Sequence, residues 1–86
     1  MKNETNKIKH GVSFSLAQNA FSDANRVVSL DHLHSTEGEK RYFCFGKVGE
    51  RVVTVRFTYR KGRIRIFGAG FWREGKVEYE KQSKIR

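Results

Sequence analysis

The 86-residue sequence contains no proline, only one cysteine and no long hydrophobic run. The single cysteine, Cys44, excludes an internal disulfide framework and a cysteine-rich zinc site, and it is typical of the reducing cytoplasm. Because no run of about eighteen apolar residues occurs, and no apolar stretch follows the lysine near the N-terminus, we expect neither a membrane span nor a signal peptide. Nothing divides the chain into parts, so the sequence predicts one domain over residues 1–86.

Acidic residues are also scarce. Nine Asp and Glu stand against 18 Lys and Arg, which gives a formal net charge of +9. Such a charge attracts polyanions, and nucleic acid or an acidic protein segment fits it equally well. With 37% hydrophobic and 13% aromatic residues, the chain is too apolar for a disordered tail, so we expect a small folded domain.

The two ends of the chain predict helices. Residues 4–10 are polar apart from Ile8 and precede a glycine suited to a helix end, and Ser13 is a candidate N-cap for a second helix. Residues 26–30 contain three apolar side chains and predict a short strand, followed by a polar loop over 31–40. Residues 73–86 lack an apolar stripe but place opposite charges four residues apart, which predicts a solvated C-terminal helix.

Three runs rich in β-branched and aromatic residues fill the middle of the chain, at 41–45, 52–60 and 63–69. Turn signals separate them, so they predict an antiparallel meander. We expect Phe43 and Phe45 in the hydrophobic core. The predicted fold class is therefore α+β, with short N-terminal helices, an antiparallel sheet of three to four strands and a C-terminal helix.

A two-residue turn at 61–62 determines the register of the last two strands. It pairs Arg60 with Arg63 and, further along the strands, Arg56 with Phe67. Because side chains alternate along a strand, one sheet face becomes apolar and the other cationic. The apolar, core-facing set is Val53, Val55, Phe57, Tyr59, Ile64 and Ile66. The opposite set is Thr54, Arg56, Thr58, Arg60, Arg63 and Arg65.

The cationic face is a candidate nucleic-acid interface, because the planar guanidinium group binds phosphate oxygens in pairs. Lys61 at the turn and Arg73 beyond the last strand extend it. The alternative is an ordinary solvated sheet face, on which arginine and threonine are common. The high net charge favours the functional interpretation.

Two residues are candidates for acid or base chemistry. His10 follows Lys9 at a predicted helix end, where the negative end of the helix dipole favours the charged imidazole. A histidine that only caps helical carbonyls is the simpler alternative. Glu39 is a candidate general base, or else only the ion-pair partner of Arg41.

Other reactive side chains support no specific chemistry. His32 and His34 beside Asp31 resemble a metal-binding pair, but no third and fourth ligand follows at a diagnostic spacing, so we expect no metal. No phosphate-binding loop, dinucleotide fingerprint or nucleophile elbow occurs, so we expect no cofactor. Cys44 is expected to be a small buried side chain. The aromatic pair at 71–72 either stacks on bases or packs the last helix against the sheet.

The string KHGVSF at residues 9–14 resembles the N-terminal helices of BrnT toxins. Residues 34–41 and 63–66 resemble the family's H-S-x-G-E-x-R and R-I-R-I-I segments, in the same order, so the resemblance covers nearly the whole chain. BrnT proteins are ribonuclease toxins of type II toxin-antitoxin systems, with a compact α+β fold similar to that of RelE toxins. They are neutralised by BrnA antitoxins, which carry a ribbon-helix-helix DNA-binding domain.

The resemblance implies a metal-independent endoribonuclease, in which the RNA's own 2′-hydroxyl attacks the adjacent phosphate. Arginines bind the backbone and stabilise the transition state, and His10 or Glu39 moves protons. The implied catalytic residues are His10, Glu39, Arg63, Arg65 and Arg73. The implied RNA-binding residues are Lys9, Arg41, Arg56, Arg60 and Lys61.

The resemblance also implies partners. They are an RNA substrate and a BrnA-like antitoxin, in a heterotetramer of two toxins around an antitoxin dimer that contacts operator DNA only through the antitoxin. We expect a cytoplasmic protein without a membrane partner. One alternative is a non-catalytic module that binds nucleic acid on the same face, and another is a surface that mainly docks an acidic antitoxin segment.

Two departures from the family pattern bear on activity and stability. No F-x-W-D strand precedes the first helix, which predicts an exposed edge on the neighbouring strand. Residues 67–70 read FGAG where the family has I-S-A-R, so Gly70 replaces the family arginine. We expect either that Arg73 supplies this charge or that catalysis is weakened.

Overall fold

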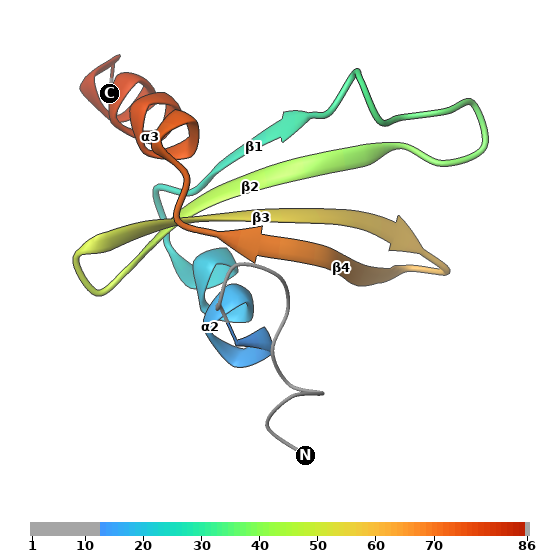
Figure 1. Cartoon of the computed structure of the whole chain (residues 1–86), viewed down its shortest axis with the longest axis horizontal. Coiled ribbons are helices and arrows are strands. Elements are labelled where there is room, and N and C mark those ends of the chain that lie inside the picture. Colours follow the sequence, from blue (N-terminus) through green and yellow to red (C-terminus); the bar gives the residue numbers. More distant parts are fainter. Residues whose placement is uncertain (1–12, 86) are drawn as a thin grey trace.

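The computed structural model describes the backbone of residues 13–85 and the side chains of residues 13–82. The helix predicted over 4–10 lies outside the described residues, as do Lys9 and His10. The described chain contains an N-terminal helix with a 3-10 turn, four strands and a C-terminal helix (Figure 1). Their bounds are α2 Phe14–Asn19, η2 Ala20–Ser22, β1 Val27–Leu30, β2 Arg41–Val48, β3 Arg51–Arg60, β4 Arg63–Gly70 and α3 Arg73–Ile85.

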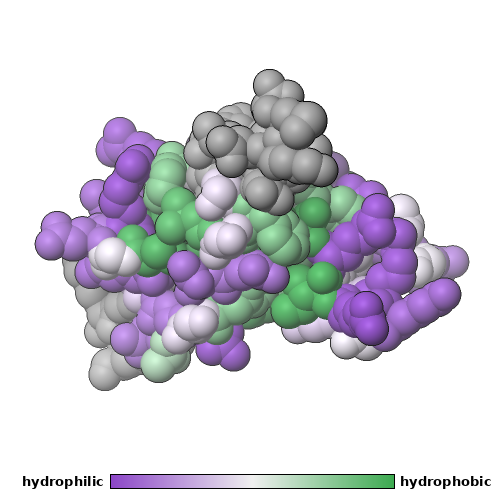
Figure 2. Space-filling model, turned by 90° about the horizontal axis from the view of Figure 1, so that it is seen from below, coloured by the Kyte–Doolittle hydropathy of each residue, from purple (hydrophilic) through white to green (hydrophobic). Residues whose placement is uncertain are grey.

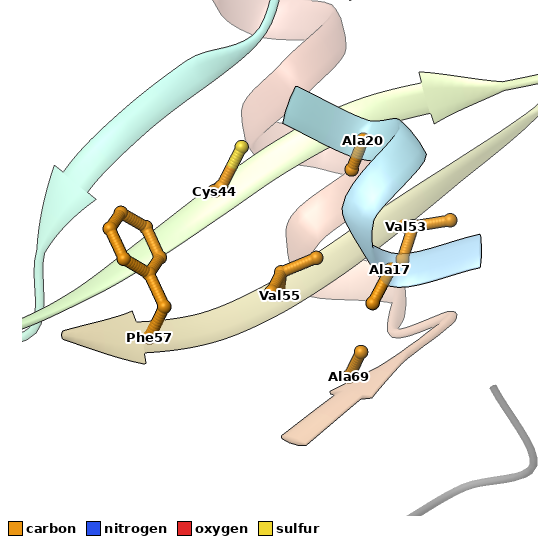
Figure 3. Close-up of a cluster of buried hydrophobic side chains, with 7 residues drawn as sticks. All are labelled: Ala17, Ala20, Cys44, Val53, Val55, Phe57 and Ala69. Atoms are coloured by element: carbon orange, nitrogen blue, oxygen red, sulfur yellow. The ribbon is translucent and has the colours of Figure 1, made fainter. Parts of the chain in front are cut away.

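The four strands form one antiparallel sheet in the order β1-β2-β3-β4, so the predicted α+β class and meander are confirmed. α2 and η2 pack on one face of the sheet (Figure 3). α3 lies on the other face, at the end where β2 turns into β3 (Figure 1). The β3–β4 turn and the loop 31–40 lie at the opposite end. Neither described helix is long and apolar enough to cross a membrane.

The first hydrophobic cluster lies between α2 and the sheet. α2 begins after Ser13, whose hydroxyl accepts a hydrogen bond from the Leu16 amide at 3.1 Å, as the predicted N-cap requires. Ala20 lies so close to β2 that a Cβ atom at Gly46 would collide with the Ala20 backbone, so only glycine fits at this crossing. The fully buried members of the cluster are Ala17, Ala20, Cys44, Val53, Val55, Phe57 and Ala69 (Figure 3).

This cluster confirms most of the predicted core but not all of it. Cys44 is fully buried, and burial raises the pKa of its thiol to about 11, which leaves it protonated and a poor nucleophile at neutral pH. Tyr59 and Ile64, predicted to face the core, are instead 55% and 43% exposed. They flank the β3–β4 turn, at the end of the sheet, so the core does not reach them.

A second hydrophobic cluster lies under α3. Phe45 is a core residue, as predicted, and Phe43 is partly buried against it, but both lie on the face predicted to be cationic, because Phe45 pairs with Thr54. The predicted C-terminal helix is present, but the prediction that it is solvated is wrong. Gly75 and Tyr79 lie four residues apart on one side of α3 and are buried against the sheet. The cluster consists of Phe45, Val52 and Tyr79, with Val27 and Phe43 at its border.

A β-bulge changes the register predicted for β3 and β4. The predicted pairs hold from the turn as far as Phe57 opposite Ile66. The prediction that Arg56 pairs with Phe67 is wrong, because Arg56 pairs with Gly68. Phe67 is the extra residue on its strand, and a bulge of this kind redirects the side chains around it.

Candidate nucleic-acid interface

Five arginines lie on the sheet face that carries α3, between that helix and the β3–β4 turn. The register places Arg41 and Arg65 on either side of Thr58 across three strands. It also places Arg60 directly opposite Arg63. The face predicted from side-chain alternation is thus present, and β2 contributes to it. We call it the arginine face, and its members are Arg41, Arg56, Arg60, Arg63 and Arg65.

Glu39 binds two members of the arginine face. Its Oε2 accepts a hydrogen bond from Nη2 of Arg60 at 2.6 Å, and its Oε1 accepts one from Nε of Arg41 at 3.2 Å. The bond from Arg60 lowers the pKa of Glu39 against the opposing effect of desolvation, and the bond from Arg41 lowers it further. A carboxylate with both oxygens engaged in this way holds guanidinium groups in place and is a poor proton acceptor.

Arg41 is held on a second side by an aromatic ring. The bulge brings Phe67 to the arginine face, where its ring centre lies 4.2 Å from the guanidinium carbon of Arg41. Between these two strands, Thr58 is buried, and its hydroxyl donates a hydrogen bond to the Lys40 carbonyl oxygen at 2.6 Å. Arg41 therefore has a defined position before any ligand binds.

The arginine face carries a surplus of positive charge. Within residues 13–82, no salt bridge engages Arg56, Arg63 or Arg65. Arg60 and Arg63 are direct cross-strand neighbours of like charge, an arrangement that is unfavourable without an anion near them. The single carboxylate of Glu39 neutralises only one of the positive charges of the arginine face. Phosphate groups of a nucleic acid would neutralise the remainder.

A groove beside the arginine face combines basic and apolar side chains. It runs between Phe14 of α2 and β4, the outer strand of the described sheet. Figure 2, which views the molecule from the α2 side, shows apolar surface across the middle and hydrophilic side chains gathered at the end formed by the β3–β4 turn. Single-stranded nucleic acid needs both kinds of side chain, for its bases and for its phosphates. The strand residues that line the groove are Arg60, Arg63, Ile64, Arg65 and Ile66, with Lys61 at the turn.

Lys61 and Arg73, both predicted to extend the cationic face, lie at opposite ends of β4. Lys61 is exposed in a two-residue turn with positive φ at both positions, 54° at Lys61 and 77° at Gly62, as the predicted hairpin requires. Arg73 begins α3, beyond the eight residues of β4, which at ~3.4 Å per residue span about 24 Å. The structure therefore places Lys61 beside Arg60 and Arg63, and places Arg73 at the opposite end of β4 from them. Gly70 is buried at the same distant end.

The aromatic pair at 71–72 takes part in packing. Phe71 packs against the first hydrophobic cluster, and the guanidinium carbon of Arg51 lies 3.6 Å from its ring centre. Trp72 is half-buried, and its carbonyl oxygen accepts a hydrogen bond from the Lys76 amide at 3.2 Å in the first turn of α3. These contacts support the packing interpretation over base stacking.

One pair of polar residues was not predicted. Asp31 and His34, in the loop between β1 and β2, are joined by a side-chain hydrogen bond. The only sequence signal for it is the spacing of three residues between an acid and a histidine, which also fits a metal-binding pair. Within the described residues, no group of three or more His, Cys, Asp or Glu side chains is placed to hold a metal ion.

Comparison with known proteins identifies a family for this chain. A family model described as a ribonuclease toxin, BrnT, of type II toxin-antitoxin systems matches residues 1–75. The matched segment includes the whole sheet, the arginine face and the loop that carries Glu39, and it ends in the first turn of α3. A search of curated proteins found no match.

Proposed function

The chain belongs to the BrnT family of ribonuclease toxins of type II toxin-antitoxin systems, and we propose on that basis that it is a metal-independent endoribonuclease that cleaves messenger RNA. Cleavage stops translation and inhibits growth, so the protein acts in the cytoplasm. The observation that carries this proposal is the arginine face, in which three guanidinium groups that form no salt bridge within residues 13–82 share a sheet face with two that Glu39 holds.

The arginine face supplies the charge that RNA binding needs. Arg56, Arg63 and Arg65 bind backbone phosphates, because guanidinium groups bind phosphate oxygens in pairs. Arg41 and Arg60, held by Glu39, contribute fixed donors at the same end of the sheet. Lys61 at the exposed turn and Lys9 add to the electrostatic attraction.

In the proposed reaction the RNA supplies its own nucleophile. The 2′-hydroxyl loses its proton and attacks the adjacent phosphorus, the bond from phosphorus to the 5′-oxygen breaks, and that oxygen gains a proton. The products are a 2′,3′-cyclic phosphate and a 5′-hydroxyl. Arg63 and Arg65 stabilise the additional negative charge of the pentavalent transition state. His10 is the candidate acid for the leaving oxygen, because histidine exchanges protons near neutral pH.

Two of the residues implied by the family resemblance take narrower roles in this proposal. Glu39 acts by holding Arg41 and Arg60, since both of its oxygens accept hydrogen bonds from them. Arg73 follows the end of β4 that lies about 24 Å from Arg63 by strand length, so it contacts a different part of a bound RNA.

The test is a cleavage assay on labelled RNA in excess chelator, run both on free RNA and in a translating cell extract. We expect products with 2′,3′-cyclic phosphate ends. Changing Arg63→Ala together with Arg65→Ala lowers the cleavage rate by roughly 10²-fold or more, the usual effect of removing transition-state donors. The matched control, Lys76→Ala together with Lys81→Ala, removes the same charge from exposed positions of α3 and leaves the rate within about twofold.

A non-catalytic nucleic-acid-binding module is the second candidate. The observation that favours it is Gly70, which stands where the family has an arginine, so the described site lacks one of the family's charged side chains. RNA that stays intact in both assays, with binding that weakens steeply as salt increases, would support this candidate and contradict the ribonuclease proposal.

We further propose that a BrnA-like ribbon-helix-helix antitoxin neutralises this protein in a heterotetramer of two toxins and an antitoxin dimer. Membership of the family implies a cognate antitoxin. An acidic antitoxin segment on the arginine face would block RNA there, and operator DNA would be contacted through the antitoxin alone. Light scattering of the purified complex tests the stoichiometry. Loss of RNA binding in the complex tests the blocking mode.

A further inference from the structure

The loop that joins β1 to β2 holds a histidine in a defined orientation. Asp31 directly follows β1, and its side chain is 6% exposed, whereas the side chain of His34 is 46% exposed. Nδ1 of His34 lies 2.8 Å from Oδ2 of Asp31, and the His34 amide donates a hydrogen bond to Oδ1 at 3.2 Å. Both oxygens of one buried carboxylate therefore bind the same residue.

This contact determines which ring nitrogen of His34 is available. An ionised carboxylate only accepts hydrogen bonds, so Nδ1 is the nitrogen that carries the proton and donates it to Asp31. In the neutral imidazole, Nε2 then has a free lone pair. A buried aspartate that binds Nδ1 and leaves Nε2 free is the arrangement that prepares a histidine to accept a proton.

Backbone hydrogen bonds tie this loop to the arginine face. The Asp31 amide donates to the carbonyl oxygen of Arg41 at 2.7 Å. The Arg41 amide donates to Oγ of Ser35 at 2.8 Å, and that hydroxyl donates to the Asp31 carbonyl at 2.7 Å. The same loop carries Glu39, which binds Arg41 and Arg60. His34 is thus part of a braced loop at the end of the sheet where the arginine face is exposed (Figure 1).

His32 provides a contrast within the same loop. It is exposed, and its side chain makes no hydrogen bond to any residue in the part of the chain that the structure describes. The two histidines have the same chemistry and differ in whether a carboxylate orients the ring. His32 is therefore a matched control for His34.

We propose that His34 is the general base of RNA cleavage and that Asp31 is the positioning residue that holds it; the inference rests on the proposed ribonuclease function and adds a base to it. Nε2 takes the proton of the 2′-hydroxyl as the 2′-oxygen bonds to phosphorus. The bond to the 5′-oxygen breaks, and this oxygen takes a proton from the acid of the ribonuclease reaction proposed above. The Asp31 carboxylate stabilises the imidazolium, which then returns its proton to water.

The first experiment compares His34→Gln with His32→Gln in the full chain, using the assay that supports wild-type cleavage. Glutamine keeps the size and polarity of the side chain but accepts no proton at neutral pH. We expect His34→Gln to lower the single-turnover rate by about 10²- to 10⁴-fold, the range typical of a general base. Binding of an RNA analogue without the reacting 2′-hydroxyl stays within about twofold, and His32→Gln keeps the wild-type rate.

The second experiment separates proton transfer from loop structure. Added imidazole restores part of the activity of His34→Ala in a saturable, pH-dependent manner, which a purely structural side chain does not allow. Asp31→Asn lowers the single-turnover rate and leaves RNA binding unchanged, because an amide that donates to Nδ1 leaves the ring proton on Nε2, where it blocks proton acceptance.

Each outcome has one meaning. If the wild type cleaves RNA and His34→Gln cleaves at the same rate, His34 is not the base and the ribonuclease proposal stands. If the wild type leaves RNA intact in both assays, both proposals fall. Equal losses in the two glutamine variants, or no rescue of His34→Ala by imidazole, limit His34 to a structural role and overturn the inference.

Discussion

The hydroxyl of Tyr79 in α3 donates a hydrogen bond to Oδ2 of Asp23 at 2.6 Å, across 56 residues of sequence. The same oxygen accepts the Lys47 amide of β2 at 2.8 Å, and Oδ1 accepts the Asn25 amide at 2.9 Å. One carboxylate therefore links the segment after η2, the second strand and the C-terminal helix. It joins the layer on one face of the sheet to the helix on the other.

Removal of this hydroxyl is expected to destabilise the fold. Tyr79→Phe keeps the buried ring but leaves the Asp23 carboxylate without one donor, which costs about 1–3 kcal/mol, as for other hydrogen bonds to charged groups. This loss of stability is measured as the decrease in the free energy of unfolding, obtained by urea titration. Val77→Ala, at a 53% exposed position of the same helix, is the control and changes this energy by less than ~0.5 kcal/mol. Equal urea midpoints for wild type and Tyr79→Phe would contradict the prediction.

Stability is also expected to fall in acid through Asp23. Burial raises the pKa of Asp23, but hydrogen bonds from Tyr79 and from two backbone amides outweigh it, so the pKa in the folded protein lies below the usual 3.8. The unfolded chain thus binds this proton at higher pH than the folded chain does. The stabilisation is complete at pH values above 3.8 and is lost as pH decreases through the folded pKa.

Urea midpoints measured between pH 7 and pH 2.5 test this dependence. Asp23→Asn is less stable at neutral pH and loses less stability on acidification than the wild type, because the titrating group is gone. Parallel pH profiles for the two proteins would show that other carboxylates cause the acid sensitivity.

Glu39→Gln tests whether Glu39 positions Arg41 and Arg60 or acts as the general base. Without the carboxylate, Arg41 and Arg60 lose the acceptor that fixes them, and the arginine face gains a net positive charge. We expect RNA binding at low salt to be as tight as in the wild type or tighter, with cleavage slowed at least about tenfold. The pH–rate profile keeps its shape. Loss of its acidic limb in Glu39→Gln would instead make Glu39 the proton acceptor.

Gly46→Ala tests the close crossing of η2 over β2. The added Cβ collides with the backbone of Ala20, which cannot rotate away as a side chain can, so we expect a loss of about 2–3 kcal/mol or more. Gly38→Ala is the control, because nothing lies within 4 Å of its Cβ position, and it changes stability by less than ~1 kcal/mol. Similar melting temperatures for the two variants would show that the crossing adjusts.

Much of the sheet was predictable because it depends on short-range rules. Alternation with a period of two placed the arginines together, and the positive φ that Gly62 adopts without strain explains why a two-residue turn sets the register from Arg60 to Phe57. The cap at Ser13 follows from local hydrogen bonding in the same way. The bulge at Phe67 was missed, although Gly68 beside it is a strand glycine of the kind that often marks a bulge.

The candidate site likewise has features that the sequence predicts and features that only the folded structure shows. The positive net charge, the turn and the arginines of β3 and β4 were evident from sequence. The hydrogen bond between Glu39 and Arg60 joins residues 21 apart in sequence, so it is evident only in the folded structure. The pair of Asp31 and His34 is close in sequence, yet a spacing of three residues is common to many motifs. Only the turn after β1 shows that the two side chains meet.

The class of fold, an antiparallel meander of three to four strands, the burial of Cys44 and the basic character of one sheet face were predictable from sequence, because these follow from local period, turn chemistry and composition. Only the folded chain shows that α3 covers one end of that face, that Arg73 and Arg63 lie at opposite ends of β4, and that Tyr79 binds Asp23. These depend on which distant surfaces meet in space. A chain's local pattern does not specify such contacts, because the free energy that selects them comes from packing of the whole molecule.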